Sequence, residues 1–349
     1  MSVEFIWHLP NHRDARYADA TERKRGERLA GDPAPFTAGV SDPRGTRFNY
    51  LDYLHQIARA ADLTGFDGIR IGNHPDGDEP WIVAGYLAPA TRRVRLIAEF
   101  DAARGSAVYA AKNAISFQRF SGNRFAWQIG STADAGQRRR QGDPAGDADL
   151  LPRIDEFLTV ARGVIGQPGG FDFKGRFFEV RGGGFSGPLG GHPVPRVYLS
   201  GASAEALQLS AAQADVHLFD AQPLADLLPL LDELRGIART LQRELQFGLR
   251  LDVLARESRE EAERDARRLA EQTGWHGSFS EDDLWLGLGN GDARATLVGS
   301  YDEVIERLAA YADAGIHSFL LGAAPHLEEA YRVGENLLPK LRARTRRAA

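Results

Sequence analysis

The sequence predicts an α/β fold, a (β/α)8 TIM barrel with insertions at its rim. Short runs rich in β-branched and aromatic residues recur along the 349 residues, and a stretch of helical periodicity follows each run. We count eight such strand and helix pairs, the number that closes a parallel sheet on itself. The loop after the first run, from Pro10 to Asp14, is not the glycine-rich turn typical of a doubly wound open sheet. A closed barrel is therefore favoured over an open sheet.

The elements follow one another in a regular order, and turn residues separate them. The expected strands span 3–9, 66–71, 94–100, 124–129, 196–200, 216–219, 247–254 and 318–321. The expected helices lie near 48–64, 80–91, 105–120, 148–165, 203–213, 223–243, 257–273 and 300–314, with a last one from about 327 to 342.

Long insertions interrupt this alternation within what we expect to be a single domain, residues 1–349. They cover about 13–47, 131–147, 170–194 and 274–297. The third contains glycine clusters and is expected to form a hairpin before the fifth strand. The first and last follow strands one and seven, which places them at the C-terminal rim where barrel enzymes keep their active sites. We predict that 274–297 is a lid.

Composition excludes several classes of function. The chain is 43% hydrophobic and 26% charged with a formal net charge of −5, and its basic residues are scattered. This pattern lacks the basic stripe of a protein that binds nucleic acid or an anionic membrane. The absence of cysteine excludes disulfides, iron–sulfur clusters, thiolate zinc sites and cysteine nucleophiles. Neither a signal peptide nor a membrane span is recognisable, so we expect a cytoplasmic protein.

A turn rich in small residues follows the fifth expected strand. Ser200, Gly201, Ala202 and Ser203 precede a helix that begins near Glu205. Small residues permit close backbone approach to a ligand, and the N–H groups at a helix N-terminus attract anions such as phosphate. The same residues also fit an ordinary N-cap at Ser203. The turn alone leaves both interpretations open.

Several segments together resemble the bacterial luciferase-like flavin-dependent monooxygenase superfamily, in particular its alkanesulfonate monooxygenase-like branch. The segments that carry the resemblance are 7–12 (Trp-His-Leu-Pro-Asn-His), 68–71 with 81–84, 111–116, 173–178, 200–203, 247–251 and 325–335 (Pro-His-Leu-Glu-Glu-Ala-Tyr-Arg-Val-Gly-Glu). They are collinear over nearly the whole chain. The resemblance implies a two-component monooxygenase that uses O2 and reduced FMN from a separate flavin reductase, and a homodimer or homotetramer. In the last segment, helical spacing also fits a purely structural stripe.

The resemblance implies the following site residues. For the cofactor they are Gln128 in the fourth expected strand and Ser131 just after it, with Ser200, Gly201, Ala202 and Ser203. For catalysis they are His12, beside the flavin, and Arg250, the arginine that helps to hold a sulfonate. To these catalytic candidates we add Asp220 and Asp252, at positions where the family has other residues. Other positions depart from the family pattern: Gly77 replaces a cysteine, Asp101 an arginine, Leu150-Leu151 an arginine–tyrosine pair, Asp220 a tryptophan, Asp252 a histidine and Ala324 a tyrosine.

The two aspartates that replace Trp and His change the expected substrate. Asp220 and Asp252 add negative charge to the site, and Asp252 lies two residues from Arg250 on one strand, where side chains point the same way. An Arg250–Asp252 ion pair is one possibility, and another is that both aspartates accept hydrogen bonds from backbone N–H groups or from His217. If the aspartates face the substrate, a small organic molecule that is neutral or cationic fits better than a simple alkanesulfonate.

Other functions remain open from the sequence. His12, His74, His217 and His326 are expected near the rim, but no two have the His-x-x-x-His spacing of a helical zinc site, so we assign no metal. The losses at Leu150-Leu151 and Ala324 also fit a degenerate barrel that acts as a non-catalytic binding or partner subunit. A deazaflavin-dependent oxidoreductase on the same fold is a third possibility.

Overall fold

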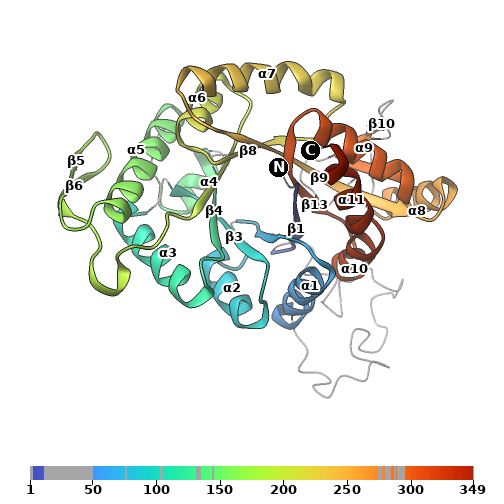
Figure 1. Ribbon diagram of the computed structural model, residues 1–349, viewed down its shortest axis with the longest axis horizontal. Helices are drawn as coiled ribbons and strands as arrows, with labels where there is room; N and C mark the ends of the chain where they lie inside the picture. The colour runs from blue at the N-terminus through green and yellow to red at the C-terminus, as the bar shows by residue number, and fades with distance from the viewer. Residues whose placement is uncertain are drawn as a thin grey trace.

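Eight parallel strands close into a barrel that helices surround (Figure 1). The computed structural model describes residues 3–11, 50–74, 77–102, 105–130, 135–143, 145–273, 277–279, 284–286, 288 and 295–348. The strands of the barrel are β1 (Glu4–Leu9), β2 (Gly68–Ile71), β3 (Arg95–Phe100), β4 (Phe125–Ile129), β7 (Arg196–Ser200), β8 (Val216–Asp220), β9 (Gln246–Arg256) and β13 (Ile316–Gly322). Each pairs in parallel with the next, and β13 pairs with β1, which confirms the predicted (β/α)8 TIM barrel.

The helices follow the strands in the predicted order. They are α1 (Tyr50–Thr64), α2 (Pro80–Leu87), α3 (Ala107–Ser121), α5 (Asp147–Gly166), α6 (Ala204–Gln213), α7 (Leu224–Thr240), α8 (Arg259–Thr273), α9 (Tyr301–Asp313), α10 (His326–Asn336) and α11 (Leu338–Ala348). The last predicted helix is in fact two, because the chain breaks its helix at Leu337. In the described part of the chain, none of the helices is long and apolar enough to cross a membrane.

Two of the expected insertions contain regular structure that the sequence pattern did not predict. A short helix, α4 (Ala135–Arg140), lies in the insertion at 131–147. The insertion at 274–297 contributes β10 (Ser278–Phe279), β11 (Leu284–Leu286) and the start of β12 (Ala295–Ser300). β12 pairs with the second half of β9, which extends beyond the barrel. The predicted hairpin at 170–194 is confirmed as β5 (Phe171–Lys174) and β6 (Glu179–Gly183).

Alternation along the strands divides their side chains between two cores. Odd-numbered positions of β1, such as Phe5 and Trp7, pack outward against the helices. The inward side chains form a separate cluster inside the barrel: Ile6, Ile97, Ala126, Tyr198, Val216, Leu218 and Leu320. This apolar layer fills the middle of the barrel, so a ligand has access only at its two ends.

A polar cluster closes the N-terminal end of the barrel. Glu4 forms an ion pair with Arg95 and accepts hydrogen bonds from Tyr198 (3.0 Å) and Ser318 (2.9 Å). Burial and the nearby Glu4 carboxylate raise the pKa of the Tyr198 hydroxyl, so this phenol stays protonated and donates. The cluster satisfies its own polar groups, which is typical of structural rather than catalytic groups.

Candidate active site

At the C-terminal mouth of the barrel, the inward-facing residues of the strands are polar. On β1 to β4 they are His8, Arg70, Glu99 and Gln128. Each lies one residue before the last residue of its strand. The parallel pairing places His8 opposite Arg70 and Glu99 opposite Gln128, and Glu99 lies two residues nearer the mouth than Ile97, the partner of Arg70. Gln128 is buried. It is one of the predicted cofactor residues, and the other three were not among the predicted site residues.

Arg70 is the centre of this group. Its guanidinium donates to Glu99 Oε2 (2.6 Å), to Gln128 Oε1 (3.1 Å) and to His8 Nδ1 (3.1 Å). Glu99 also accepts from the Gln128 amide (3.0 Å) and from the backbone N–H of Asn73 (2.8 Å). The Arg70 and Glu99 side chains are only 5% and 14% exposed. Because each charge has an opposite charge and further hydrogen bonds, this buried pair is compensated.

The contact with Arg70 fixes the protonation state of His8. A guanidinium only donates, so His8 Nδ1 accepts and a neutral ring carries its proton on Nε2. The His8 ring meets that of His326, the first residue of α10, edge to face with the centroids 5.7 Å apart. His8 therefore presents an N–H donor at the mouth, which makes it a candidate for orienting a ligand or moving a proton.

The opposite side of the mouth is formed by β7, β8 and β9. Arg250 donates from Nε (2.7 Å) and Nη2 (2.6 Å) to Asp220 Oδ1. The two residues are direct partners in the pairing of β8 with β9. The hypothesis of an Arg250–Asp252 pair is therefore wrong: the arginine is paired across the strands. Asp252 instead points toward Gly322 of β13, where its carboxylate fills the space that a side chain at Gly322 would need.

The turn at 200–203 lies exposed beside these residues. Ser203 is the N-cap of α6, and its hydroxyl accepts from the Ala206 N–H (3.2 Å). Gly201 adopts φ +133°, and a side chain there would clash with Ala206. Hydrogen bonds from its own backbone N–H and from Ser203 lower the pKa of the exposed Glu205 carboxylate. The start of α6 thus attracts an anionic group, as a phosphate site requires. In this structure the anionic group is the carboxylate of Glu205.

Comparison with known proteins identifies the family. The sequence profile described as luciferase-like monooxygenase matches residues 32–318, most of the chain. The chain belongs to the luciferase-like monooxygenase family. It is accordingly a flavin-dependent oxidoreductase of the monooxygenase type, and the predicted resemblance is confirmed at the level of the family.

Solved structures with the same fold diverge widely in sequence. A riboflavin lyase superposes with a TM-score of 0.73 at 17% identity, over 99% of this chain and 92% of the other. An EDTA monooxygenase from Chelativorans sp. BNC1 gives 0.72 at 15% identity, over 99% and 94%. An F420-dependent secondary alcohol dehydrogenase gives 0.68 at 14% identity, over 98% and 99%. At these identities the likeness shows the fold of a luciferase-like monooxygenase and no more.

The remaining predicted residues of this luciferase-like monooxygenase do not lie together at the mouth among the described residues. His12 and Ser131 lie outside the described residues, as does much of the predicted lid at 274–297. His217 faces away from the mouth: it is fully buried against α6, where its Nδ1 lies 2.8 Å from Ser210 Oγ. It is therefore a residue of the outer core and not a partner of the two aspartates.

The departure at Gly77 has a structural reason. A Cβ at this position would lie 2.5 Å from the carbonyl oxygen of Asn11, so the two loops pack too closely for a side chain. Asn11 joins the same loops, because its amide donates to the carbonyl of Gly72 (2.9 Å). The luciferase-like monooxygenase fold here uses glycine where the resemblance implies cysteine.

One signal in the sequence could have revealed the missed residues. Arg70 and Glu99 are charged residues inside short, mainly apolar strands, each one position before the strand ends. A charge buried in a barrel strand needs a partner, and the C-terminal strand ends of a barrel face its active site. These two charges are therefore the signal for the polar group at the mouth.

Proposed function

We propose that this luciferase-like monooxygenase binds reduced FMN at the C-terminal mouth and uses O2 to oxygenate a small organic substrate. The anion-attracting turn at 200–203 supports this proposal most directly. It lies exposed at the rim, and α6 already holds a carboxylate at its first turn. The flavin phosphate would replace the Glu205 side chain there, which is exposed and free to turn away.

The chain's own residues have separable roles in this proposal. Reduced flavin, supplied by a separate reductase, provides the two electrons that activate O2. Ser203 and the first turn of α6 bind the phosphate. His8 donates from Nε2 at the mouth, and Arg70 keeps that ring in its donor tautomer. The apolar layer below, with Ile6, excludes water from the floor of the site.

The charges at the mouth indicate the class of substrate. Arg70 is paired with Glu99, and Arg250 is paired with Asp220. A sulfonate would have to displace Asp220 in order to reach Arg250, and it would lie close to that carboxylate. We propose a neutral or cationic substrate for this reason.

A second candidate is hydride transfer with F420, a deazaflavin. The F420-dependent secondary alcohol dehydrogenase covers 98% of this chain with a TM-score of 0.68, against 0.72 for the EDTA monooxygenase, so the fold does not discriminate between the cofactors. Both cofactors carry a phosphate that could use the turn at 200–203.

Anaerobic titration with reduced FMN and with reduced F420, followed by mixing with O2, tests the proposal. We expect FMN to bind more tightly and the FMN complex to consume O2 and oxygenate substrate. Ser203→Asp keeps a good N-cap but adds a negative charge, and we expect FMN binding to weaken at least about tenfold. Ser106→Asp, at the exposed N-cap of α3, is the matched control. Tighter binding of F420, or equal FMN affinity in Ser203→Asp and the native protein, would contradict the assignment.

A further inference from the structure

A cavity lies at the N-terminal end of the barrel, opposite to the mouth. It has a volume of about 700 Å3, within the range of small-molecule sites. Its wall includes the first residues of β7 and β9, Arg196 and Gln246, and the second residue of β13, His317. Because parallel strands begin at the N-terminal end of a barrel, this cavity is separated from the mouth by the apolar layer inside the barrel. It is therefore no part of the proposed flavin site.

Positive charge dominates the wall of this cavity. Four arginines line it, against two carboxylates, Asp215 and Glu244. Asp215 is already engaged, because it accepts from the backbone N–H of Val197 (2.7 Å) and lies 3.8 Å from Arg162. Two of the arginines are engaged as well. Arg243 donates to the carbonyl groups at the end of α6, and Arg196 donates to the side chain of Gln246. The remaining arginines decide what the cavity attracts.

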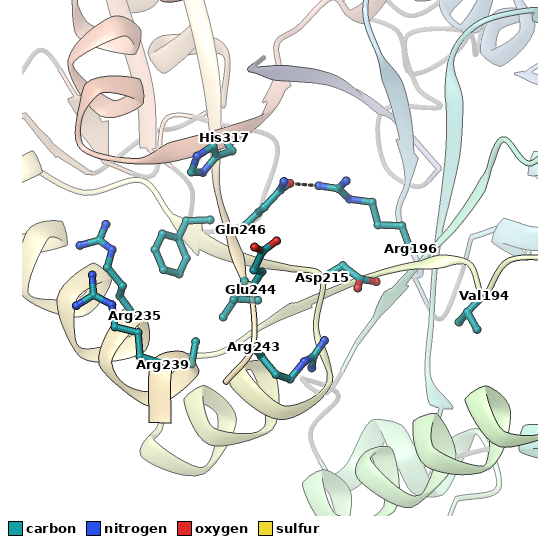
Figure 2. A pocket seen from close by; sticks show the side chains of 12 residues that line it. Val194, Arg196, Asp215, Arg235, Arg239, Arg243, Glu244, Gln246 and His317 are labelled. Atoms are coloured by element: carbon teal, nitrogen blue, oxygen red, sulfur yellow. Dashed lines mark hydrogen bonds between the residues drawn. The ribbon is translucent and has the colours of Figure 1, made fainter. Parts of the chain in front are cut away.

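Arg235 and Arg239 are the two that face the cavity from α7. They are four residues apart, and Figure 2 shows their side chains projecting side by side from one face of the helix. Arg235 packs over the ring of Phe247 (5.5 Å) and pairs with the exposed Asp232 (2.6 Å). Arg239 is exposed, and its side chain forms no ion pair or hydrogen bond with any described residue. Together they present two guanidinium groups at the opening of the cavity.

The inner wall offers further unused polar atoms beside apolar surface. Nδ1 of His317 and Nε of Arg196 are buried and lack a hydrogen-bond partner among the described residues. A buried nitrogen without a partner costs stability, which points to a ligand that supplies one. Phe247, Leu245 and Val194 provide the apolar part of the same wall.

We propose that this cavity binds an organic anion, a small molecule with a phosphate or carboxylate group and an aromatic or aliphatic body. Arg235 and Arg239 bind the anionic group, since guanidinium groups match the geometry of phosphate and carboxylate oxygens. The body enters the cavity and packs on Phe247. The site is separate from the proposed flavin site. One strand links the two sites, because Phe247 and Arg250 both lie on β9, three residues apart.

The test uses phenyl phosphate as the probe, with the flavin-free full chain at low salt, by calorimetry and by ligand-observed NMR. We expect binding of phenyl phosphate, weaker binding of inorganic phosphate, and none of uncharged benzyl alcohol. Arg235→Gln/Arg239→Gln is expected to weaken binding at least about tenfold, and the single variant Arg239→Glu, at an exposed position, by a similar factor. Arg264→Gln/Arg268→Gln removes two exposed arginines with the same spacing on α8 and should change the affinity less than twofold.

Three results would overturn the proposal. The first is no binding to the native protein, and the second is an unchanged affinity in both cavity variants. The third is loss of phenyl phosphate binding in Ser203→Asp, which would place the probe at the mouth. Circular dichroism and thermal melting of each variant confirm that a loss of binding is not a loss of fold.

Discussion

At the scale of single residues, His217 shows how burial sets protonation. Its ring is enclosed between β8 and α6, packs edge to face on Phe219 (4.4 Å) and contacts Ser210. Burial lowers the pKa of His217 to about 4. The folded protein therefore keeps this ring neutral at a pH where an unfolded chain protonates it.

This difference makes stability depend on pH. An unfolded histidine titrates near pH 6.5, so below that pH the unfolded state binds a proton that the folded state does not bind until pH 4. The stabilisation is complete above about pH 6.5 and is lost as the pH falls, by about 2 kcal/mol at pH 5. The side chain of His217→Gln can still form a hydrogen bond with Ser210. Between pH 7 and pH 5 we expect the free energy of unfolding of this variant to fall by about 2 kcal/mol less than that of the native protein.

Urea unfolding at pH 7 and pH 5 measures the effect, and His192→Gln, a histidine in the loop before β7, is the control. The same pH dependence in native protein and His217→Gln would show that this histidine is not responsible.

At the scale of elements, the packing of α10 against α1 explains several residues of the segment 325–335. Glu329 of α10 is buried and accepts hydrogen bonds from Arg256 (3.2 Å) and from Arg332. Burial raises the pKa of Glu329, and the two arginines oppose that shift. Gly334, on the same helix, faces Thr64 of α1 so closely that any Cβ would overlap the threonine side chain. These residues are structural. Of the stripe that helical spacing indicated, Ala330 and Gly334 are buried, whereas Tyr331 is exposed.

Gly334→Ala is therefore expected to destabilise the protein although alanine favours helices. The gain in propensity is about 1 kcal/mol, whereas separating two packed helices costs more, so we expect a net loss of about 1–3 kcal/mol. Gly236→Ala in α7 is the matched control, because a Cβ there meets no atom within 4 Å and should stabilise the protein by about 0.5–1 kcal/mol. Thermal and urea unfolding of both variants measure the difference. A stabilised Gly334→Ala variant would mean that α1 and α10 adjust at no cost.

At the scale of the whole molecule, the barrel collects its active-site charges from strands far apart in the sequence. Arg70, Glu99, Asp220, Arg250 and Asp252 come from β2, β3, β8 and β9, and meet only because the sheet closes. Three of these side chains are carboxylates and two are guanidinium groups, so their formal charges sum to a negative value. This property belongs to the assembled barrel and not to any one strand.

The proposed preference for neutral or cationic substrates follows from that sum. With reduced FMN and O2 supplied, we expect the native protein to oxygenate amines, sulfides or alcohols and to leave small alkanesulfonates unchanged. Asp252→Asn removes one negative charge, so we expect the activity ratio of sulfonate to amine to rise about tenfold. Asp313→Asn, at the far end of α9, is the control. Efficient turnover of a small alkanesulfonate by the native protein would refute the charge argument.

The sequence by itself determined the fold and the local structure of the turn at 200–203. The barrel strands were all predicted to within a few residues, because a barrel strand shows a short apolar run whatever its neighbours are. The turn at 200–203 was also recognised, since its small residues and N-cap are local features. The strand β12 was missed, because it pairs with the half of β9 beyond the barrel.

The tertiary structure alone decided the partners within the site. Alternation along β9 places Arg250 and Asp252 on the same face, but the register between β8 and β9 places Asp220 directly opposite Arg250. Register depends on how the closed sheet staggers its strands, which no single strand encodes. The same holds for Arg70 and Glu99, whose charges are tolerated in apolar strands only because the neighbouring strand brings the partner.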